Sequence, residues 1–119
     1  MTKKEYMEQL PDKSIDAKKV EEIEAIYCTK LPEIVKKIVS NANESIFFDD
    51  DDRILSYKEI ADAQVDLHVN FKSKGLIPLA DCGENDFIVY HFNDGSWSKF
   101  NIIDETVFKK RNALDELLK

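Results

Sequence analysis

The stretch Gly75-Leu-Ile-Pro-Leu-Ala-Asp-Cys-Gly-Glu-Asn-Asp-Phe-Ile-Val-Tyr-His-Phe92 decides the fold that the sequence predicts. Gly75 indicates the end of a helix, because glycine readily adopts the left-handed conformation that follows a last helical turn. The apolar run over residues 76–80 predicts a strand, and Pro78 restricts it to an edge or to a side without a strand partner. Residues 86–92 are apolar on both alternating faces, which is typical of a central strand covered on both sides.

On the C-terminal side of this stretch, the sequence predicts a hairpin and a closing helix. Asn93-Asp94-Gly95-Ser96 carries the Asp-Gly signal of a tight turn, so residues 97–103 should pair back antiparallel. Residues 104–108 predict a short helical turn, which their polar members are suited to cap. A last helix is expected from about Asn112, and it should bury three leucines: Leu114, Leu117 and Leu118.

On the N-terminal side, two short strands are predicted around an acidic turn. Ile46-Phe47-Phe48 is apolar and β-prone, Asp49 to Asp52 form the turn, and Arg53-Ile54-Leu55 returns as a second strand. Ser56-Tyr57-Lys58-Glu59 then has the pattern of a capping box, because the serine oxygen accepts one free N–H and the glutamate reaches back to another. The helix that this box opens should continue to about Gly75.

Two further helices are predicted before these strands. One starts at Asp16, where apolar residues recur with helical spacing, and the other follows Pro32, whose preset φ suits a first helical turn. Residues 1–14 predict a loosely ordered N-terminal lead-in, which leaves residues 15–119 as a single domain. The order helix-helix-strand-strand-helix-strand-strand-strand-helix predicts an α+β fold, with a mostly antiparallel sheet of about four to six strands flanked by helices.

Composition and charge narrow the classes of function. The chain has 119 residues, of which 43% are hydrophobic, and this suits one core and excludes wholesale disorder. Lys and Arg number 17 against 24 Asp and Glu, a formal charge of −7. Such a surface repels nucleic-acid backbones and favours basic partners, although moderate negative charge also serves simply to keep a protein soluble. No apolar run approaches ~20 residues and no signal peptide is evident, so we expect a cytoplasmic protein without nucleic-acid or membrane partners.

The sequence carries no recognisable catalytic or metal-binding pattern. Asp49–Asp52 and Asp81–Asp86 each begin like a calcium loop, but neither places glycine at the sixth position. Cys28 and Cys82 are too few and too unpatterned for a zinc site or a disulfide framework, and we expect reduced thiols. His91 lies on a predicted strand, where it could face solvent, and it has no evident orienting partner for acid–base catalysis. The sequence therefore predicts no enzyme activity, no cofactor and no metal.

The segments described above resemble the SUKH superfamily, which includes the Smi/Knr-type cell-wall-assembly regulators and many bacterial toxin-immunity proteins. The 75–90 block, with Ile-Pro, Gly and Asn-Asp-Phe in order, is the most specific match. Leu31-Pro32 with its following helix and the Ile54–Ile60 segment also fit, and the likeness covers roughly residues 15–119. Many members carry a glycine-bearing turn after the second helix, where this chain has Asn41-Ala42-Asn43, and asparagine supplies similar backbone angles. Further matches lie near the C-terminus: Trp97, Phe100, Phe108, Leu114 and Leu118.

The resemblance implies a non-enzymatic binder. Similar bacterial proteins are typically immunity factors that neutralise a cognate polymorphic toxin, often a nuclease, by direct contact, and the family has no shared catalytic residue. We expect a toxin domain with a basic surface to be contacted by exposed aromatic side chains and by acidic loop residues: Asp49, Asp50, Asp51, Asp52, Asp81, Glu84 and Asp86. A purely structural role of these loops also stays open, because acidic turns are commonly only turns. A small-molecule or metal-dependent enzyme stays open as a third class of function, which a deep pocket with convergent ionisable groups would favour. The alternative function is a regulatory or scaffold domain that binds a cellular protein unrelated to toxins, and the oligomeric state is not predicted.

Overall fold

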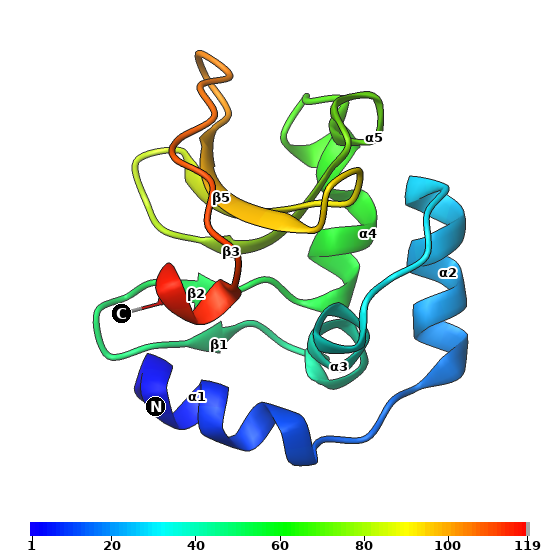
Figure 1. Cartoon of the computed structure of the whole chain (residues 1–119), viewed down its shortest axis with the longest axis vertical. Helices are drawn as coiled ribbons and strands as arrows, with labels where there is room; N and C mark the ends of the chain where they lie inside the picture. Colours follow the sequence, from blue (N-terminus) through cyan, green and yellow to red (C-terminus); the bar gives the residue numbers. More distant parts are fainter. Residues whose placement is uncertain (119) are drawn as a thin grey trace.

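Five strands form one antiparallel sheet, whose spatial order is the chain order β1-β2-β3-β4-β5 (Figure 1). The computed structural model describes residues 1–118, and residue 119, the last of the predicted domain, lies outside the described residues. The predicted α+β fold with a mostly antiparallel sheet is confirmed. The elements are α1 (Lys3–Gln9), η1 (Leu10–Asp12), α2 (Ala17–Tyr27), α3 (Glu33–Asn41), β1 (Ile46–Phe47), β2 (Arg53–Ile54), α4 (Tyr57–Asp66), α5 (Phe71–Lys74), β3 (Leu76–Asp81), β4 (Asp86–His91), β5 (Ser96–Asn101) and η2 (Leu114–Glu116).

The strands β3 and β4 form the centre of the sheet, and both are buried along nearly their whole length. Their pairing shifts register between Pro78 and Ala80. β2 pairs with β3 only at Ala80 and Asp81, so the missing N–H of Pro78 interrupts no bond to β2. The prediction allowed Pro78 either an edge strand or a side without a strand partner. β3 is an internal strand, but Pro78 lies outside the residues that pair with β2, so the second placement is the one observed.

The core lies between the sheet and the helices. α4 and α5 pack against β3, and α2 packs against α3, α4 and α5, so that the helices gather beside the sheet (Figure 1). Phe71 of α5 meets Phe100 of β5 edge to face, with ring centroids 6.0 Å apart. The buried Tyr27 hydroxyl donates to the Ile60 carbonyl at 2.8 Å, which gives this polar group a partner and joins α2 to α4.

The N-terminal segment is more ordered than the lead-in expected over residues 1–14. α1 opens with a capping box at Thr2, which satisfies free N–H groups of its first turn. Tyr6 and Leu10 are buried, and the Tyr6 ring meets Phe48 edge to face with centroids 5.5 Å apart. These apolar side chains explain the difference, because a helix gains most of its stability in a protein from packing an apolar face on the core.

The helix predicted from Ser56 to Gly75 is divided into two helices. α4 ends before His68, which adopts a left-handed conformation with a φ of 55°. Asn70 then caps α5, because its side chain accepts the Ser73 N–H at 3.2 Å. Gly75 ends α5 as predicted, with a φ of 74°. After this break the new helix α5 begins, and its first residue, Phe71, is buried against the sheet.

The C-terminal segment is extended where helical structure was predicted. Residues 106–111 run beside β5 and bridge it at two points, instead of including a helical turn. The closing helix expected from about Asn112 is only the short η2. Leu114 and Leu118 are nevertheless buried, as predicted, and Leu117 is partly buried. Pairing with an open sheet edge satisfies backbone groups directly, and this outweighs a local capping preference.

Candidate functional site

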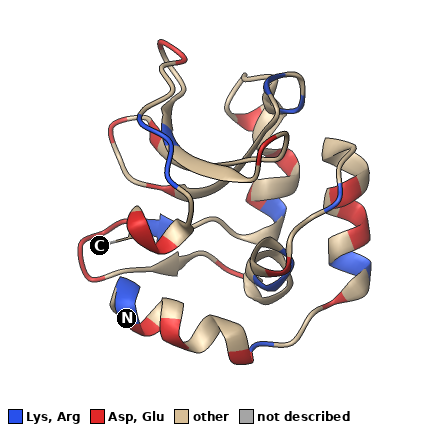
Figure 2. Cartoon of the chain, viewed as in Figure 1, with Lys and Arg blue, Asp and Glu red and all other residues tan. Residues whose placement is uncertain are grey.

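Three acidic turns meet at one end of the sheet, which we call the acidic end. β2 and β4 begin at this end, whereas β3 and β5 finish there, so the antiparallel order brings the β1–β2 turn, the β3–β4 turn and the turn after β5 together. Figure 2 shows their red segments following one another down one side of the molecule. The nine carboxylates of the acidic end belong to Asp49, Asp50, Asp51, Asp52, Asp81, Glu84, Asp86, Asp104 and Glu105.

Three of the four aspartates in the β1–β2 turn are paired with the start of α1. Lys3 Nζ lies 2.6 Å from the Asp50 carboxylate and 2.8 Å from that of Asp52, and the terminal amine lies 3.2 Å from Asp49. Burial would lower the pKa of Lys3, but its hydrogen bonds to the two aspartates outweigh burial and raise that pKa. The bond from Lys3 in turn lowers the pKa of Asp50. Asp51 has no ion-pair partner among the described residues.

Arg53 ties the β3–β4 turn to α4. Its Nη2 donates to Asp81 at 3.3 Å, and its Nη1 donates to the two oxygens of Glu59 at 2.8 and 2.7 Å. The Ser45 hydroxyl donates to the same carboxylate at 2.6 Å. Desolvation would raise the pKa of Glu59, but hydrogen bonds from Ser45, the Ser56 backbone and Arg53 outweigh it and lower the pKa to about 2. The charge of Asp81 is therefore compensated, and β2, β3 and α4 are joined at one guanidinium.

Asn101 joins the β3–β4 turn to the turn after β5. Its Nδ2 donates to the Asp86 carboxylate at 2.8 Å and to the Glu84 carbonyl at 3.4 Å. Its Oδ1 accepts the N–H groups of Ile103 at 2.9 Å and Asp104 at 3.2 Å. One side-chain amide thus holds two acidic turns together, while the carboxylates of Glu84, Asp86 and Asp104 have no ion-pair partner within the described part of the chain.

The structure places all seven acidic residues predicted from the sequence at the acidic end, in two adjacent turns. Sequence reasoning missed Asp104 and Glu105, because it placed them in or before a helical turn. Glu105 pairs with Lys74 of α5. The sequence does hold a signal for them, because Asp104-Glu105 directly follows the last predicted strand. In an antiparallel hairpin the second strand ends where the first one began, so this pair should lie near the start of β4.

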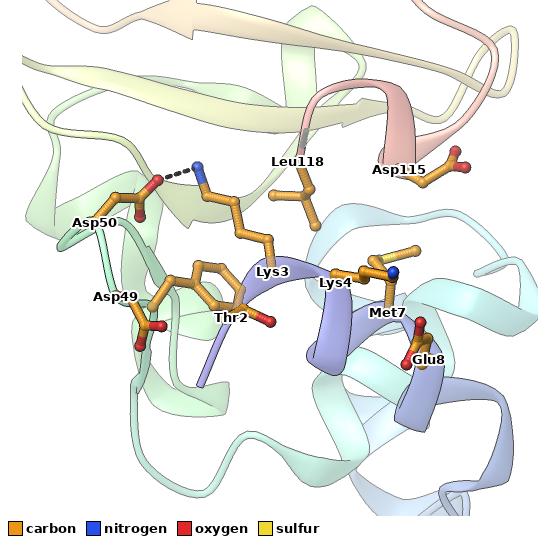
Figure 3. A pocket seen from close by; sticks show the side chains of 10 residues that line it. Thr2, Lys3, Lys4, Met7, Glu8, Asp49, Asp50, Asp115 and Leu118 are labelled. Carbon is orange, nitrogen blue, oxygen red and sulfur yellow. Dashed lines mark ion pairs between the residues drawn. The ribbon is translucent and has the colours of Figure 1, made fainter.

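A groove of about 720 Å³ borders the acidic end, between α1, the β1–β2 turn and η2. Met7, Phe48 and Leu118 provide its apolar lining, and charged side chains surround them. Figure 3 shows Lys3 pointing to Asp50 on one side of the groove, with Asp115 on the other side. An apolar centre with a charged rim is an arrangement that suits an anchor side chain of a protein partner.

The histidine–serine contact in the sheet lies inside the core. His91 Nε2 and Ser98 Oγ are 2.7 Å apart on β4 and β5, and the two residues are 7% and 0% exposed. The expectation that His91 could face solvent is therefore wrong, because the central strand is covered on both faces. Burial is the main cause that lowers the pKa of His91. Since Ser98 is closed to solvent, this pair has no access to a substrate and satisfies buried polar groups.

The described part of the chain holds neither a metal-binding cluster nor a membrane-spanning helix. Within residues 1–118, no three Asp, Glu, His or Cys side chains are arranged to hold a metal ion. None of the described helices combines the length and the apolar character that crossing a membrane requires. What the acidic end offers chemically is an array of carboxylates on hydrogen-bonded turns beside an apolar groove.

No family model, no curated protein and no solved structure matches this chain.

Proposed function

We propose that this chain is a non-enzymatic protein-binding module, a bacterial immunity protein that neutralises a cognate toxin domain by covering a basic surface on it. The observation that carries the proposal is the charge balance of the acidic end. Within residues 1–118, its nine carboxylates form ion pairs with only four cations, namely the terminal amine, Lys3, Arg53 and Lys74. The resemblance to the SUKH superfamily supports the same function.

The turns that carry the uncompensated carboxylates are already held by hydrogen bonds before any partner arrives. Asp51, Glu84, Asp86 and Asp104 lack an ion-pair partner among the described residues, and all four lie in or beside tight turns. Because Asn101 fixes two of these turns to each other, a complex would order few groups on binding. Fixed negative charge also attracts a cationic partner at long range and raises its rate of association.

A complex at the acidic end and the adjoining groove would need a modest share of the surface. An interface of standard size buries roughly 800 Å² per partner, about an eighth of the 6553 Å² accessible surface of this chain. The groove lined by Met7, Phe48 and Leu118 would accept one apolar anchor at the border of the charged area. Such a complex combines a desolvated centre with a charged rim, as specific interfaces commonly do.

A nuclease toxin fits this surface particularly well. A nuclease must present cations to the phosphate backbone of its substrate, and an acidic protein that covers those cations blocks cleavage without any catalysis of its own. The proposal places the protein in the cytosol, where such a toxin would reach nucleic acid.

The proposal is tested with the product of the reading frame next to this gene. That product is expressed alone, with the wild-type chain, and with an Asp51→Asn/Glu84→Gln variant, while growth and complex formation are measured. Both replacements remove a charge from a side chain without an ion-pair partner. A Glu21→Gln/Glu33→Gln variant is the matched control, since it makes the same change in net charge at exposed sites on α2 and α3.

We expect the wild-type chain to restore growth and to form a stoichiometric complex. The acidic-end variant should bind roughly 2- to 30-fold more weakly at low salt, because each exposed ion pair is worth about 0.2–1 kcal/mol. The control variant should bind like the wild type. Equal affinity of all three proteins would remove the acidic end from the interface. A toxic product that the chain neither binds nor neutralises would contradict the immunity function. Binding of a non-toxic cellular protein that weakens in the acidic-end variant would favour a scaffold domain.

A further inference from the structure

Residues 106–111, which we call the edge segment, form the outer border of the sheet beside β5. Two bonds link Trp97 and Arg111, whose N–H groups donate to each other's carbonyls at 2.9 and 2.6 Å. The Phe108 N–H donates to the Lys99 carbonyl at 3.0 Å, and the Thr106 carbonyl accepts the Asn101 N–H at 3.0 Å. The edge segment thus satisfies β5 and exposes an edge of its own.

The outward backbone groups of the edge segment have no partner among the residues that the structure describes. Within residues 1–118, the N–H groups of Val107, Lys109 and Lys110 make no hydrogen bond, whereas those of Phe108 and Arg111 are bonded to β5. Every residue of the edge segment is exposed. An edge of this kind is a template for one more strand, because its free donors and acceptors match those of an extended chain.

Apolar side chains are concentrated at the same edge. Seven large apolar residues are exposed in the described chain, and three of them lie within a stretch of six residues, namely Ile103 (72%), Val107 (46%) and Phe108 (44%). Extended partner segments are held by main-chain bonds, and their alternate side chains find apolar contacts beside the strand. The exposed Val107 and Phe108 supply such contacts next to the free N–H groups.

The charge of the edge segment is opposite to that of the whole chain. Lys109, Lys110 and Arg111 are consecutive in a protein of net charge −7, and Figure 2 shows this blue stretch on the strand that descends toward η2. Lys110 pairs with Asp94 at 2.7 Å, but Lys109 and Arg111 have no ion-pair partner among the described residues. A second copy of the chain is a poor occupant, because edge-to-edge pairing would bring two Lys-Lys-Arg runs together.

We propose that the edge segment is a docking site for an extended, acidic segment of a partner protein, which pairs with it as an additional strand. The backbone of that segment would bond to the free groups of Val107 and Lys109, which alternate on the outer side. Because successive side chains of a strand point to opposite faces, its carboxylates would meet Lys109 on one face and its apolar side chains would cover Phe108 on the other. This site uses none of the carboxylates of the acidic end, so it stands independently of the proposed immunity function.

The test uses an acetylated and amidated peptide of eight residues, in which valine alternates with glutamate, added to the full-length protein. Amide hydrogen exchange and chemical shifts are followed by NMR. Exchange at Val107 and Lys109 should slow by about tenfold at 90% occupancy, since only the free state then exchanges. The amides of Phe108 and Arg111, which are already bonded to β5, should keep their exchange rates. A peptide of alternating valine and lysine should leave all four amides unchanged.

Variants separate specific docking from a general charge effect. Lys109→Glu should weaken binding of the acidic peptide about 2- to 30-fold at low salt, because an attraction becomes a repulsion. Lys58→Glu on α4 makes the same change in net charge at an exposed site and should leave the affinity unchanged. Equal loss in both variants, equal binding of the two peptides, or protection elsewhere in the chain would overturn the proposal. Anionic phospholipid vesicles that shift the edge-segment amides when the acidic peptide does not would overturn it in favour of a lipid surface.

Discussion

Replacing Glu59 with glutamine should destabilise the fold by about 1–2 kcal/mol at neutral pH and far less near pH 2. The carboxylate accepts hydrogen bonds from Arg53 and Ser45, and its pKa in the folded chain is about 2 against an ordinary value of 4.5. A difference of about 2.5 in pKa corresponds to at most ~3.4 kcal/mol. Because the Glu59 side chain is 37% exposed, solvent screens these contacts, and roughly a third to a half of that limit is expected.

The stability lost in Glu59→Gln should depend on pH in a defined direction. A carboxylate whose pKa is lower in the folded chain stabilises it fully above pH 4.5, and the contribution is lost as pH falls through about 2. Urea unfolding followed by the fluorescence of Trp97 should therefore show the largest gap between variant and wild type at neutral pH. Glu5→Gln is the matched control, since Glu5 occupies the same capping-box position in α1 without an arginine partner. A gap that stays constant from pH 7 to about pH 2.5, or an equal loss for Glu5→Gln, would refute the reasoning.

Three further outcomes are expected. Tyr6→Ala should lower the free energy of unfolding by about 2–4 kcal/mol because it opens a cavity under α1, whereas Tyr6→Phe should cost less than about 1 kcal/mol; equal losses in urea unfolding would contradict the docking of this helix. Asn101→Ala should shift and broaden the NMR amide signals of both turns that Asn101 joins, and Asn112→Ala should not; a change in one turn alone would show that the amide is no connector. Since burial lowers the pKa of His91 from 6.5, the unfolded chain takes up the proton first, and stability should decline below about pH 6.5; an equally steep decline in His91→Gln would assign the proton uptake to another group.

Local signals in the sequence predicted the elements that depend on neighbouring residues. The capping box at Ser56, the helix stop at Gly75 and the tight turn at Asp94-Gly95 each act within a few positions, and the structure has an element boundary at each of them. The apolar run over 86–92 indicated a doubly covered strand, and β4 is buried on both faces. Such predictions succeed because the backbone groups involved find their partners within one or two turns of the chain.

Predictions failed where a distant partner competes with a local preference. The polar residues at 104–106 are suited to start a helical turn, but β5 offers backbone partners to residues 106–111 and the segment becomes extended. The segment before Pro11 lacks a strong apolar stripe, yet its Tyr6 packs against Phe48. Its Lys3 forms ion pairs with two aspartates of the β1–β2 turn. These contacts join residues that are more than forty positions apart, so no local pattern encodes them.

The sequence by itself determined the α+β class, the order of the strands along the chain, and the presence of acidic turns in a protein of charge −7. Only the tertiary structure decided that three of those turns share one end of the sheet, which carboxylates remain without a cation, and that a basic edge lies beside β5. The reason is physical. Secondary structure responds to hydrogen bonds and side-chain spacing within a few residues, whereas the field of a surface is the sum over charges that the fold brings together.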